Sequence, residues 1–531
     1  MNMKNILKYM AILLFTMFAL SSCKKSFEEL GADINRPGSV PPSLLLNGIL
    51  NDMYDSPYGN NEKWSQYFLQ NYDYYGNNRY DFESGDNYYN TLKNVLKMEA
   101  EAKKIQLPEV NSYSALAKFF KAYFFTKMSL EMGDLPMKDA LKGVENLTPA
   151  YDSQKDIFKQ ALDWLESANT DLASLQSSAN ILQGDIYFDN DLQKWQQAVN
   201  TFHLRLLIHL SKKADAADAA DIQIRKQFSD IVTNPSKYPL MSSSADNLEY
   251  KYIYPTNKYP KNPGSFGFDA LRENTSSTYV SLLTTLQDPR VYVTCEPAAA
   301  IFKSNDAANM TAFVGANPGE DLGIMYAKAN AGQYSLLNRY HYYRTFTAEN
   351  CIQIGYPEMC FNIAEGINRG WAPALTATDA ERYYKAGITA SMDFYGIPAS
   401  GALPVYFFKQ GYSIDDPSAF NSYSIDVDLT AYYNKSGVKY NGNNSTGLTQ
   451  ILQQRYLALY SHSGLESYFT YRRSGIPTFG TGPGTGNSGR IAMRFQYLSS
   501  EISTNNANYK SALTNQFGGN DDINAIMWIL K

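Results

Sequence analysis

The spacing of apolar residues between positions 90 and 232 constrains the fold of this chain most strongly. Apolar side chains recur every three or four residues in three stripes, which run from Tyr113 to Met128, from Ile157 to Leu172 and from Trp195 to Leu210. This period places the apolar side chains on one face of a helix. The region is therefore predicted to form antiparallel helix pairs.

Residues with turn and cap preferences separate the three stripes. Gly133 is expected to end the first helix, and Ser153 is expected to cap the second. Three carboxylates, Asp185, Asp189 and Asp191, stand directly before the third helix. Aspartate side chains accept hydrogen bonds from free backbone N–H groups, so capping and turn formation are favoured for them over catalysis or calcium binding.

The rest of the chain divides into loop-rich and helical segments. Residues 233–350 are rich in Pro, Asn, Gly and aromatic residues and predict long structured loops, with one short helix near 277–286. Helical periodicity returns at 354–368, 378–395 and 446–475, and a glycine-rich segment at 480–489 predicts a flexible loop. We expect an all-α fold in which residues 44–531 form a single domain with a loop-rich insert at about 233–350. No clean repeat period is visible.

The N-terminus is typical of a bacterial lipoprotein signal. Two lysines among the first eight residues precede an apolar stretch at 10–20, which is too short to span a bilayer, and the segment ends in Leu-Ser-Ser-Cys at Cys23. Residues 1–22 are predicted to be cleaved, Cys23 to carry lipid, and residues 23–43 to form a lipidated terminus and polar linker. An ordinary secretory signal that contains a cysteine is the alternative.

Charge and cysteine content narrow the class of protein. The formal net charge is −5 without long runs of one sign, so no nucleic-acid partner is expected. Apart from Cys23 the chain holds three cysteines, Cys295, Cys351 and Cys360. An odd number argues against a disulfide framework, and we predict three buried thiols, with one disulfide as the less favoured alternative.

The sequence gives little support for catalysis. The four histidines, His203, His209, His341 and His462, are scattered, and neither H-E-x-x-H nor G-x-S-x-G occurs. Residues 484–489 match G-x-G-x-x-G, but no apolar strand precedes them. We therefore predict no catalytic residue, no metal site and no cofactor. The separation of carboxylate pairs is not visible in a sequence, so glycoside hydrolysis stays as the least favoured alternative.

Tyrosine is unusually frequent in this chain, which has 42 tyrosines and five tryptophans. A tyrosine ring stacks on apolar faces such as those of sugars, and its hydroxyl forms hydrogen bonds. Tyrosines gather with Asn, Asp and Gly in three clusters, at 58–89, 250–268 and 340–343. From them we predict ligand contacts by Tyr74, Tyr75, Tyr80, Tyr254, Tyr259, Phe266, Tyr342 and Tyr343. The alternative for each of these residues is that its ring packs in a helix interface, with any hydroxyl group exposed to water.

Several short motifs resemble those of one known family. They are Met-Gly-Asp-Leu-Pro at 132–136, Pro-Ala-Tyr-Asp-Ser-Gln at 149–154, Asp-Pro-Arg at 288–290, Gly-Ile-Thr-Ala-Ser-Met at 387–392 and Arg-Arg-Ser-Gly-Ile-Pro at 472–477. In this order they are similar to the SusD/RagB-like outer-membrane lipoproteins of Bacteroidota, in the branch called SusD-like type 2. The motifs are mostly scaffold, so they locate no ligand residue.

The resemblance implies a fold and a function. The fold would be a scaffold of degenerate tetratricopeptide-like helix pairs with loops that form a ligand face. The protein would be lipid-anchored in the outer membrane and exposed on the cell surface, where it would act without catalysis and pass nutrients to a SusC-like TonB-dependent transporter. An oligosaccharide is the expected ligand, and a peptide is the alternative, because tyrosine suits both.

Overall fold

The computed structural model of the chain describes residue 3 and residues 39–177, 182–267 and 269–531. The predicted signal peptide, Cys23 and most of the linker lie outside the described residues. The described body begins with helix α3 (Pro42–Asp52). None of the described helices combines the length and the apolar character that a membrane span requires.

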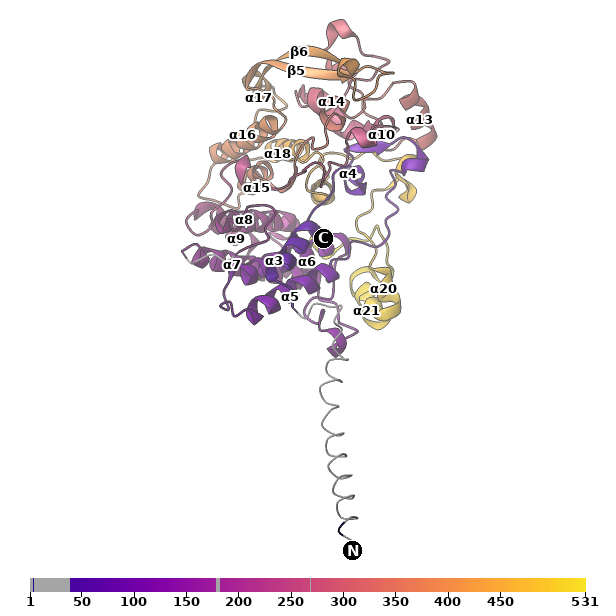
Figure 1. Cartoon of the computed structure of the whole chain (residues 1–531). Helices are drawn as coiled ribbons and strands as arrows, with labels where there is room; N and C mark the ends of the chain where they lie inside the picture. The colour runs from indigo at the N-terminus through magenta and orange to yellow at the C-terminus, as the bar shows by residue number, and fades with distance from the viewer. Residues whose placement is uncertain (1–2, 4–38, 178–181, 268) are drawn as a thin grey trace.

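The predicted helix pairs lie at one end of the molecule (Figure 1). The helices there are α5 (Tyr89–Lys104), α6 (Ser112–Met132), α7 (Gln154–Leu175), α8 (Leu192–His209) and α9 (Ile224–Thr233). Each of the first four packs against the next one along the chain. Helix α6 lies between neighbours on several sides, so nearly all of its residues are buried. The periodicity of the sequence thus predicted these elements correctly.

The expected caps are present at the ends of these helices. Gly133 ends α6 at φ 103°, a left-handed conformation that glycine adopts easily. The Ser153 side chain accepts from the N–H of Asp156 at the start of α7, and Asp191 accepts from two N–H groups at the start of α8. Asp185 accepts from the indole Nε1 of the fully buried Trp195 at 2.8 Å. These aspartates therefore have the structural roles that the sequence favoured.

A second helical layer comes from the C-terminal half of the chain. It contains α15 (Tyr356–Asn368), α16 (Ala377–Phe394), α18 (Ser445–Ala458) and α19 (Glu466–Ser474), and the shorter α20 (Ser499–Thr504) and α21 (Asn506–Phe517) follow. The first two match the predicted segments. The segment 446–475, by contrast, is two helices, because the chain turns between Ala458 and Glu466, where Ser461 and Ser463 have positive φ.

Buried ion pairs connect the two helical layers. The guanidinium of Arg205 on α8 donates to Glu358 on α15 at 2.9 Å, and Arg455 on α18 donates to the same carboxylate at 2.8 Å. Arg455 also reaches Glu466 on α19 at 3.2 Å. All four side chains are buried. Because removing one member would leave a charge without its partner, the network fixes how four helices meet.

Short elements make up much of the segment that was predicted as loops. They are α10 (Asp269–Arg272), α11 (Ser277–Leu286), α12 (Val291–Thr294), α13 (Leu322–Asn330) and α14 (Arg339–Tyr343), together with strands β2 (Leu248–Tyr250), β3 (Glu273–Thr275) and β4 (Cys351–Ile354). Only α11 was predicted. Strand β3 pairs antiparallel with β1 (Phe68–Gln70), which joins this segment to the N-terminal part of the chain. Strand β2 pairs antiparallel with β4, which directly follows the segment predicted as loops.

A β-hairpin that the sequence analysis missed lies at the opposite end from α5–α8 (Figure 1). Strands β5 (Ser400–Phe408) and β6 (Phe420–Asp428) pair antiparallel, from Ser400 opposite Asp428 to Phe408 opposite Phe420. Leu403, Val405 and Phe407 are buried at alternate positions, as in a strand with one face on the core. The short helix α17 (Leu429–Tyr433) follows directly.

The glycine-rich segment packs closely against the chain instead of forming a free loop. A Cβ atom on Gly482 would lie 2.3 Å from the carbonyl oxygen of Gly319, and one on Gly484 would lie 2.0 Å from that of Glu320. Such distances are far below van der Waals contact. These glycines therefore allow two backbone segments to approach each other closely. The expectation of a flexible loop was wrong.

The three cysteines behave as expected. Cys295, Cys351 and Cys360 are buried and free. Burial raises the pKa of the Cys295 thiol to about 12, and that of Cys360 to about 12 as well, so both thiols are protonated at neutral pH.

Candidate functional site

Half of the tyrosines and phenylalanines predicted to contact ligand lie in the core. Tyr80, Tyr259, Tyr342 and Tyr343 are all buried, and Tyr80 donates to the carbonyl oxygen of Trp64 at 2.8 Å. A buried ring has no face to offer a ligand. For these four residues the structure corrects the sequence-based prediction and favours the alternative of packing.

The three tyrosine clusters do converge, but inside the molecule. The ring of Tyr58 from the first cluster lies 6.2 Å from that of Tyr259 in the second and 5.4 Å from that of Tyr342 in the third. Both contacts are edge-to-face, an arrangement that aromatic quadrupoles favour. The clusters therefore hold the loop-rich segment together, and burial raises the pKa of all three phenols.

The other four predicted residues reach the surface in three places. Tyr74 is 84% exposed, and its ring lies edge-to-face with the partly exposed Tyr75 at 5.2 Å. Tyr254 is 54% exposed and stacks on Phe346 at 4.4 Å. Phe266 is partly buried, with its ring edge-to-face to the buried Tyr343 and to the partly buried Phe408. Within the described part of the chain, the ring contacts of Tyr254 and Phe266 do not include Tyr74.

Tyrosines and polar residues surround a cavity of about 470 Å³, which we call the aromatic cavity and which is lined by Tyr72 and Asp73, the two residues before Tyr74. Its volume lies within the range of ligand pockets. The lining residues come from the loop after β1, from the start of α13 and from the glycine-rich segment, and they are Asn71, Tyr72, Asp73, Asn77, Asn78, Arg79, Glu320, Asp321, Leu322, Gly323, Tyr326, Pro483 and Gly484.

A stacked pair of tyrosines forms one wall of the aromatic cavity. The rings of Tyr72 and Tyr326 are 5.1 Å apart with an interplanar angle of 30°. The guanidinium of Arg272 lies 5.0 Å from the centre of Tyr72 and 5.2 Å from that of Tyr326. Such cation–π contacts hold ring orientation. Tyr72 is nevertheless 40% exposed, so part of its face stays available.

Buried amides hold the loop that carries Tyr72 and Tyr74. The Asn78 side chain accepts from the N–H of Gln70 at 2.9 Å and donates to the carbonyl oxygen of the same residue at 2.8 Å. Asn71 donates to the carbonyl oxygen of Leu271 at 3.1 Å. A 3-10 turn over Asp73–Tyr75 lies between them. The loop is thus closed at its base on the β1–β3 pair while its tip projects Tyr74 outward.

Charged side chains around the aromatic cavity are of both signs. Arg79 pairs with Asp81 at 2.5 Å, and Lys328 on α13 pairs with Glu320. Below the loop, Lys63 donates to the carbonyl oxygen of Asn77 at 3.1 Å, and burial lowers the pKa of its ammonium. The cavity therefore offers hydrogen-bond donors and acceptors without one dominant charge, which suits a neutral polar ligand.

Tyr72, Tyr326 and Arg272 were not predicted as site residues. Tyr72 belongs to the first tyrosine cluster, so composition pointed to its neighbourhood. Tyr326 lies on α13, in a segment that was interpreted as loops. The cap residue Asp321, which accepts from the N–H groups of Gly323 and Ile324, was the signal in the sequence for that helix.

A larger cavity of about 870 Å³ lies elsewhere and shares no lining residue with the aromatic cavity. It has no exposed stacked aromatic pair, so it is a different kind of site. Within the residues that the structure describes, no group of three or more His, Cys, Asp or Glu side chains is placed to hold a metal ion.

Comparisons with known proteins identify relatives of the whole chain. The sequence model of a family described as starch-binding and associating with the outer membrane, SusD-like type 2, matches residues 34–498. A SusD homolog from Bacteroides fragilis has 30% sequence identity and a TM-score of 0.77, and covers 93% of this chain and 100% of its own. No curated protein matched the chain.

Two further solved structures are similar. A second SusD homolog from Bacteroides fragilis has 27% identity and a TM-score of 0.75, again over 93% of this chain and 100% of its own. A chitin-binding SusD homolog from Flavobacterium johnsoniae has 18% identity and a TM-score of 0.65, over 92% of this chain and 98% of its own. At that identity the last similarity concerns the fold alone.

Proposed function

Since the chain belongs to the SusD-like family of starch-binding proteins that associate with the outer membrane, we propose that it captures oligosaccharides at the cell surface and delivers them to a SusC-like TonB-dependent transporter. The lipid on Cys23 would hold it to the outer membrane. It would bind its ligand without chemical turnover, in keeping with a family defined by binding.

The stacked pair of Tyr72 and Tyr326 beside the exposed Tyr74 is the observation that carries this proposal. Flat aromatic faces at the edge of a cavity suit the C–H faces of sugar rings, which are apolar, while the ring hydroxyls of a sugar need hydrogen-bond partners. Asn77, Asp73 and Arg79 supply such partners around the same cavity. The proposed ligand contacts are therefore Tyr72, Tyr74, Tyr75 and Tyr326.

The rigidity of the loop supports capture with low entropic cost. Asn78 and Asn71 are buried and hydrogen-bonded to backbone groups, so the loop is ordered before any ligand arrives. A site that is already ordered loses less conformational freedom on binding. The mixed charges of the wall favour a neutral oligosaccharide over an acidic one.

Titration calorimetry of the purified protein against neutral glycans, acidic glycans and mixed peptides tests the proposal. We expect heat from one class of neutral oligosaccharide and no release of shorter products. If only peptides bind, the ligand is a peptide and the oligosaccharide proposal is wrong. If shorter sugars are released, the protein is a glycoside hydrolase and the capture proposal is wrong.

The proposed partner is tested separately. A SusC-like transporter encoded beside this protein should copurify with it from detergent-solubilised outer membranes. Copurification should be unchanged in Tyr74→Ala, because this side chain is proposed to contact the ligand and not the transporter. Recovery of this protein without any transporter would contradict the proposed delivery step.

A further inference from the structure

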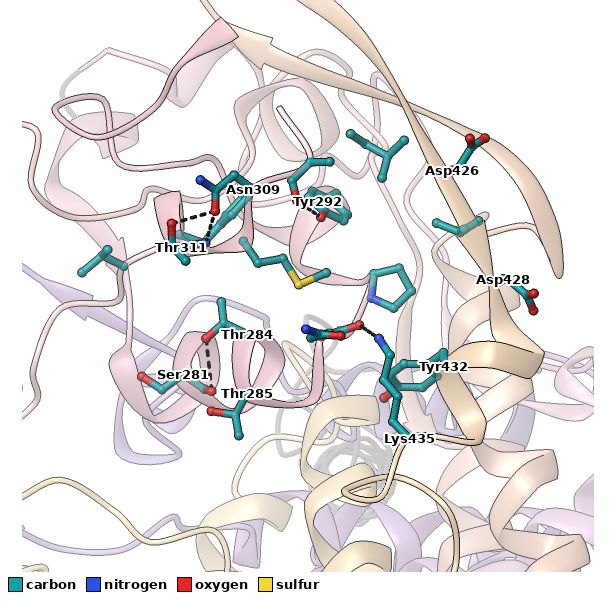
Figure 2. Close-up of a pocket in the computed structure, with 18 of the residues that line it drawn as sticks. Ser281, Thr284, Thr285, Tyr292, Asn309, Thr311, Asp426, Asp428, Tyr432 and Lys435 are labelled. Carbon is teal, nitrogen blue, oxygen red and sulfur yellow. Dashed lines mark hydrogen bonds between the residues drawn. The ribbon is translucent and has the colours of Figure 1, made fainter. Parts of the chain in front are cut away.

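The larger cavity lies between α11, the 3-10 turn Met310–Ala312 and the β6–α17 connection (Figure 2). Its volume of about 870 Å³ is near the upper end of the range for ligand pockets. No residue that lines it was selected by the sequence analysis, and none belongs to the aromatic cavity. It is thus a second concave surface that the proposed function does not use.

Small hydroxyl side chains line the α11 wall of this cavity. Ser281, Thr284 and Thr285 stand at positions i, i+3 and i+4, so they share one face of the helix. Thr284 donates to the carbonyl oxygen of Ser281 within the helix at 3.2 Å. For the exposed hydroxyls of Ser281 and Thr285, the described residues supply no hydrogen-bond partner. Both are therefore free to donate and accept.

Polar groups also stand on the other walls. Asn309 and Thr311 face α11 across the cavity (Figure 2). Asp426 and Asp428 belong to the β6 wall, but their carboxylates point away from the cavity (Figure 2). Asp428 accepts from the N–H groups that begin α17. The wall opposite α11 thus presents amide and hydroxyl groups.

Lys435 supplies the only ammonium among the described lining residues. Its Nζ donates to the carbonyl oxygen of Gln287 at 3.1 Å and lies 5.4 Å from the ring centre of Tyr432. No carboxylate oxygen of the described residues is within ion-pair distance of it. An ammonium has three donors, so it can serve an additional acceptor on a ligand.

Aromatic stacking is not available in this cavity. Tyr292, Phe313 and Tyr432 line it but are buried, and the Tyr292 hydroxyl already donates to the carbonyl oxygen of Ala308 at 2.6 Å. A ligand here would be recognised by hydrogen bonds and not by ring faces. Two aspartates against one lysine disfavour an anionic ligand, and the hydroxyl-rich walls disfavour an apolar one.

We propose that this cavity is a second saccharide subsite, which binds a neutral sugar through hydrogen bonds to its hydroxyls. A sugar hydroxyl both donates and accepts, so it is complementary to the hydroxyls of Ser281 and Thr285 and to the donor Lys435. The proposal rests on the proposed function in taking the same class of ligand, and it adds a site with different chemistry.

Chain connectivity places the two subsites near each other. Gly315 lines the larger cavity and Glu320 lines the aromatic cavity, five residues further along the chain. A fully extended residue spans at most about 3.6 Å, so the Cα atoms of these two wall residues are no more than about 18 Å apart. Two subsites at this distance raise the effective concentration of a long oligosaccharide once one end is bound.

Stoichiometry and side-chain changes test the second subsite. The probes are the neutral trisaccharides maltotriose, cellotriose, xylotriose and triacetylchitotriose, each titrated into the full chain by calorimetry. We expect two sites for the trisaccharide that binds. The pair Ser281→Ala and Thr285→Val removes two hydroxyls, and loss of two neutral hydrogen bonds weakens one site about tenfold or more. Lys435→Met provides an independent change, which removes the ammonium donor and has the same expected direction.

The matched control is Thr446→Val, which removes an exposed threonine hydroxyl on α18, outside both cavities. It should leave both sites unchanged, and Tyr72→Ala should remove the other site only. One bound trisaccharide that is lost in Tyr72→Ala would overturn the second subsite and leave the proposed function intact. Failure of every trisaccharide to bind would overturn both, and two sites that are insensitive to the α11 and Lys435 changes would place the second one elsewhere.

Discussion

Replacing Tyr74 by alanine separates a ligand contact from a structural contact. The side chain is 84% exposed and packs only at its edge against Tyr75. Aromatic side chains offer roughly 200 Å² in all, so about 170 Å² of Tyr74 faces solvent. A sugar ring that covers half of this removes about 85 Å² from water, which at about 25 cal/mol per Å² contributes about 2 kcal/mol.

This contribution corresponds to a loss of about 30-fold in affinity for Tyr74→Ala. The free energy of unfolding should change by less than about 0.5 kcal/mol, because an exposed side chain leaves no cavity behind. Calorimetric titration of the oligosaccharide measures the first quantity, and urea unfolding measures the second. The two together distinguish lost contact from lost fold.

Tyr254→Ala is the matched control, because Tyr254 is also an exposed tyrosine that was predicted from the sequence. It is 54% exposed and stacks on Phe346, and none of its chain neighbours lines the aromatic cavity, whereas Tyr72 and Asp73 beside Tyr74 do. Its removal should leave affinity unchanged. The reasoning is refuted if Tyr74→Ala binds as tightly as the wild type, and a loss confined to Tyr254→Ala would move the site to the second cluster.

Three further predictions concern stability, packing and anchoring. Burial alone would raise the pKa of Glu365, but Arg473, Arg369 and Arg455 outweigh it and hold that pKa at about 2, against an ordinary value of 4.5. The carboxylate therefore stabilises the fold by about 3 kcal/mol above pH 4.5, and this is lost as the pH falls towards 2. Glu365→Gln should flatten that part of the stability curve in urea unfolding at several pH values, and an unchanged curve would contradict the pairing. Gly484→Ala should lower the free energy of unfolding by about 2 kcal/mol, because its Cβ would lie 2.0 Å from the carbonyl oxygen of Glu320. Gly48→Ala, with nothing within 4 Å, is the control that should be neutral or stabilising. Cys23→Ser should release the protein from the membrane fraction and abolish palmitate labelling, and retention of either would argue against a lipid on this residue.

Local patterns predicted the helices well because a helix depends on residues that are near in sequence. The stripes of α6, α7 and α8, together with caps such as Ser153, specify period and boundaries within a few turns. The hairpin was not predicted because β5 and β6 are joined by the long connection 409–419. That connection lacks the short Asn-Gly or Asp-Gly turn that marks a hairpin in a sequence.

The candidate site was only partly predictable, since a tyrosine serves equally in a core and at a ligand surface. Tyr342 is buried because it packs against Tyr58, which is far away in the sequence, and no local pattern reports such a contact. Tyr74 and Tyr75 reach the surface because the adjoining loop is closed by Asn78. Composition therefore located the right cluster, and long-range packing decided which members are exposed.

A crystal structure of the protein with its tightest neutral oligosaccharide would locate the binding site. We expect sugar rings against Tyr72 and Tyr74, with hydroxyls hydrogen-bonded to side chains of the aromatic cavity such as Asn77. An oligosaccharide bound elsewhere, with the aromatic cavity empty, would contradict this expectation.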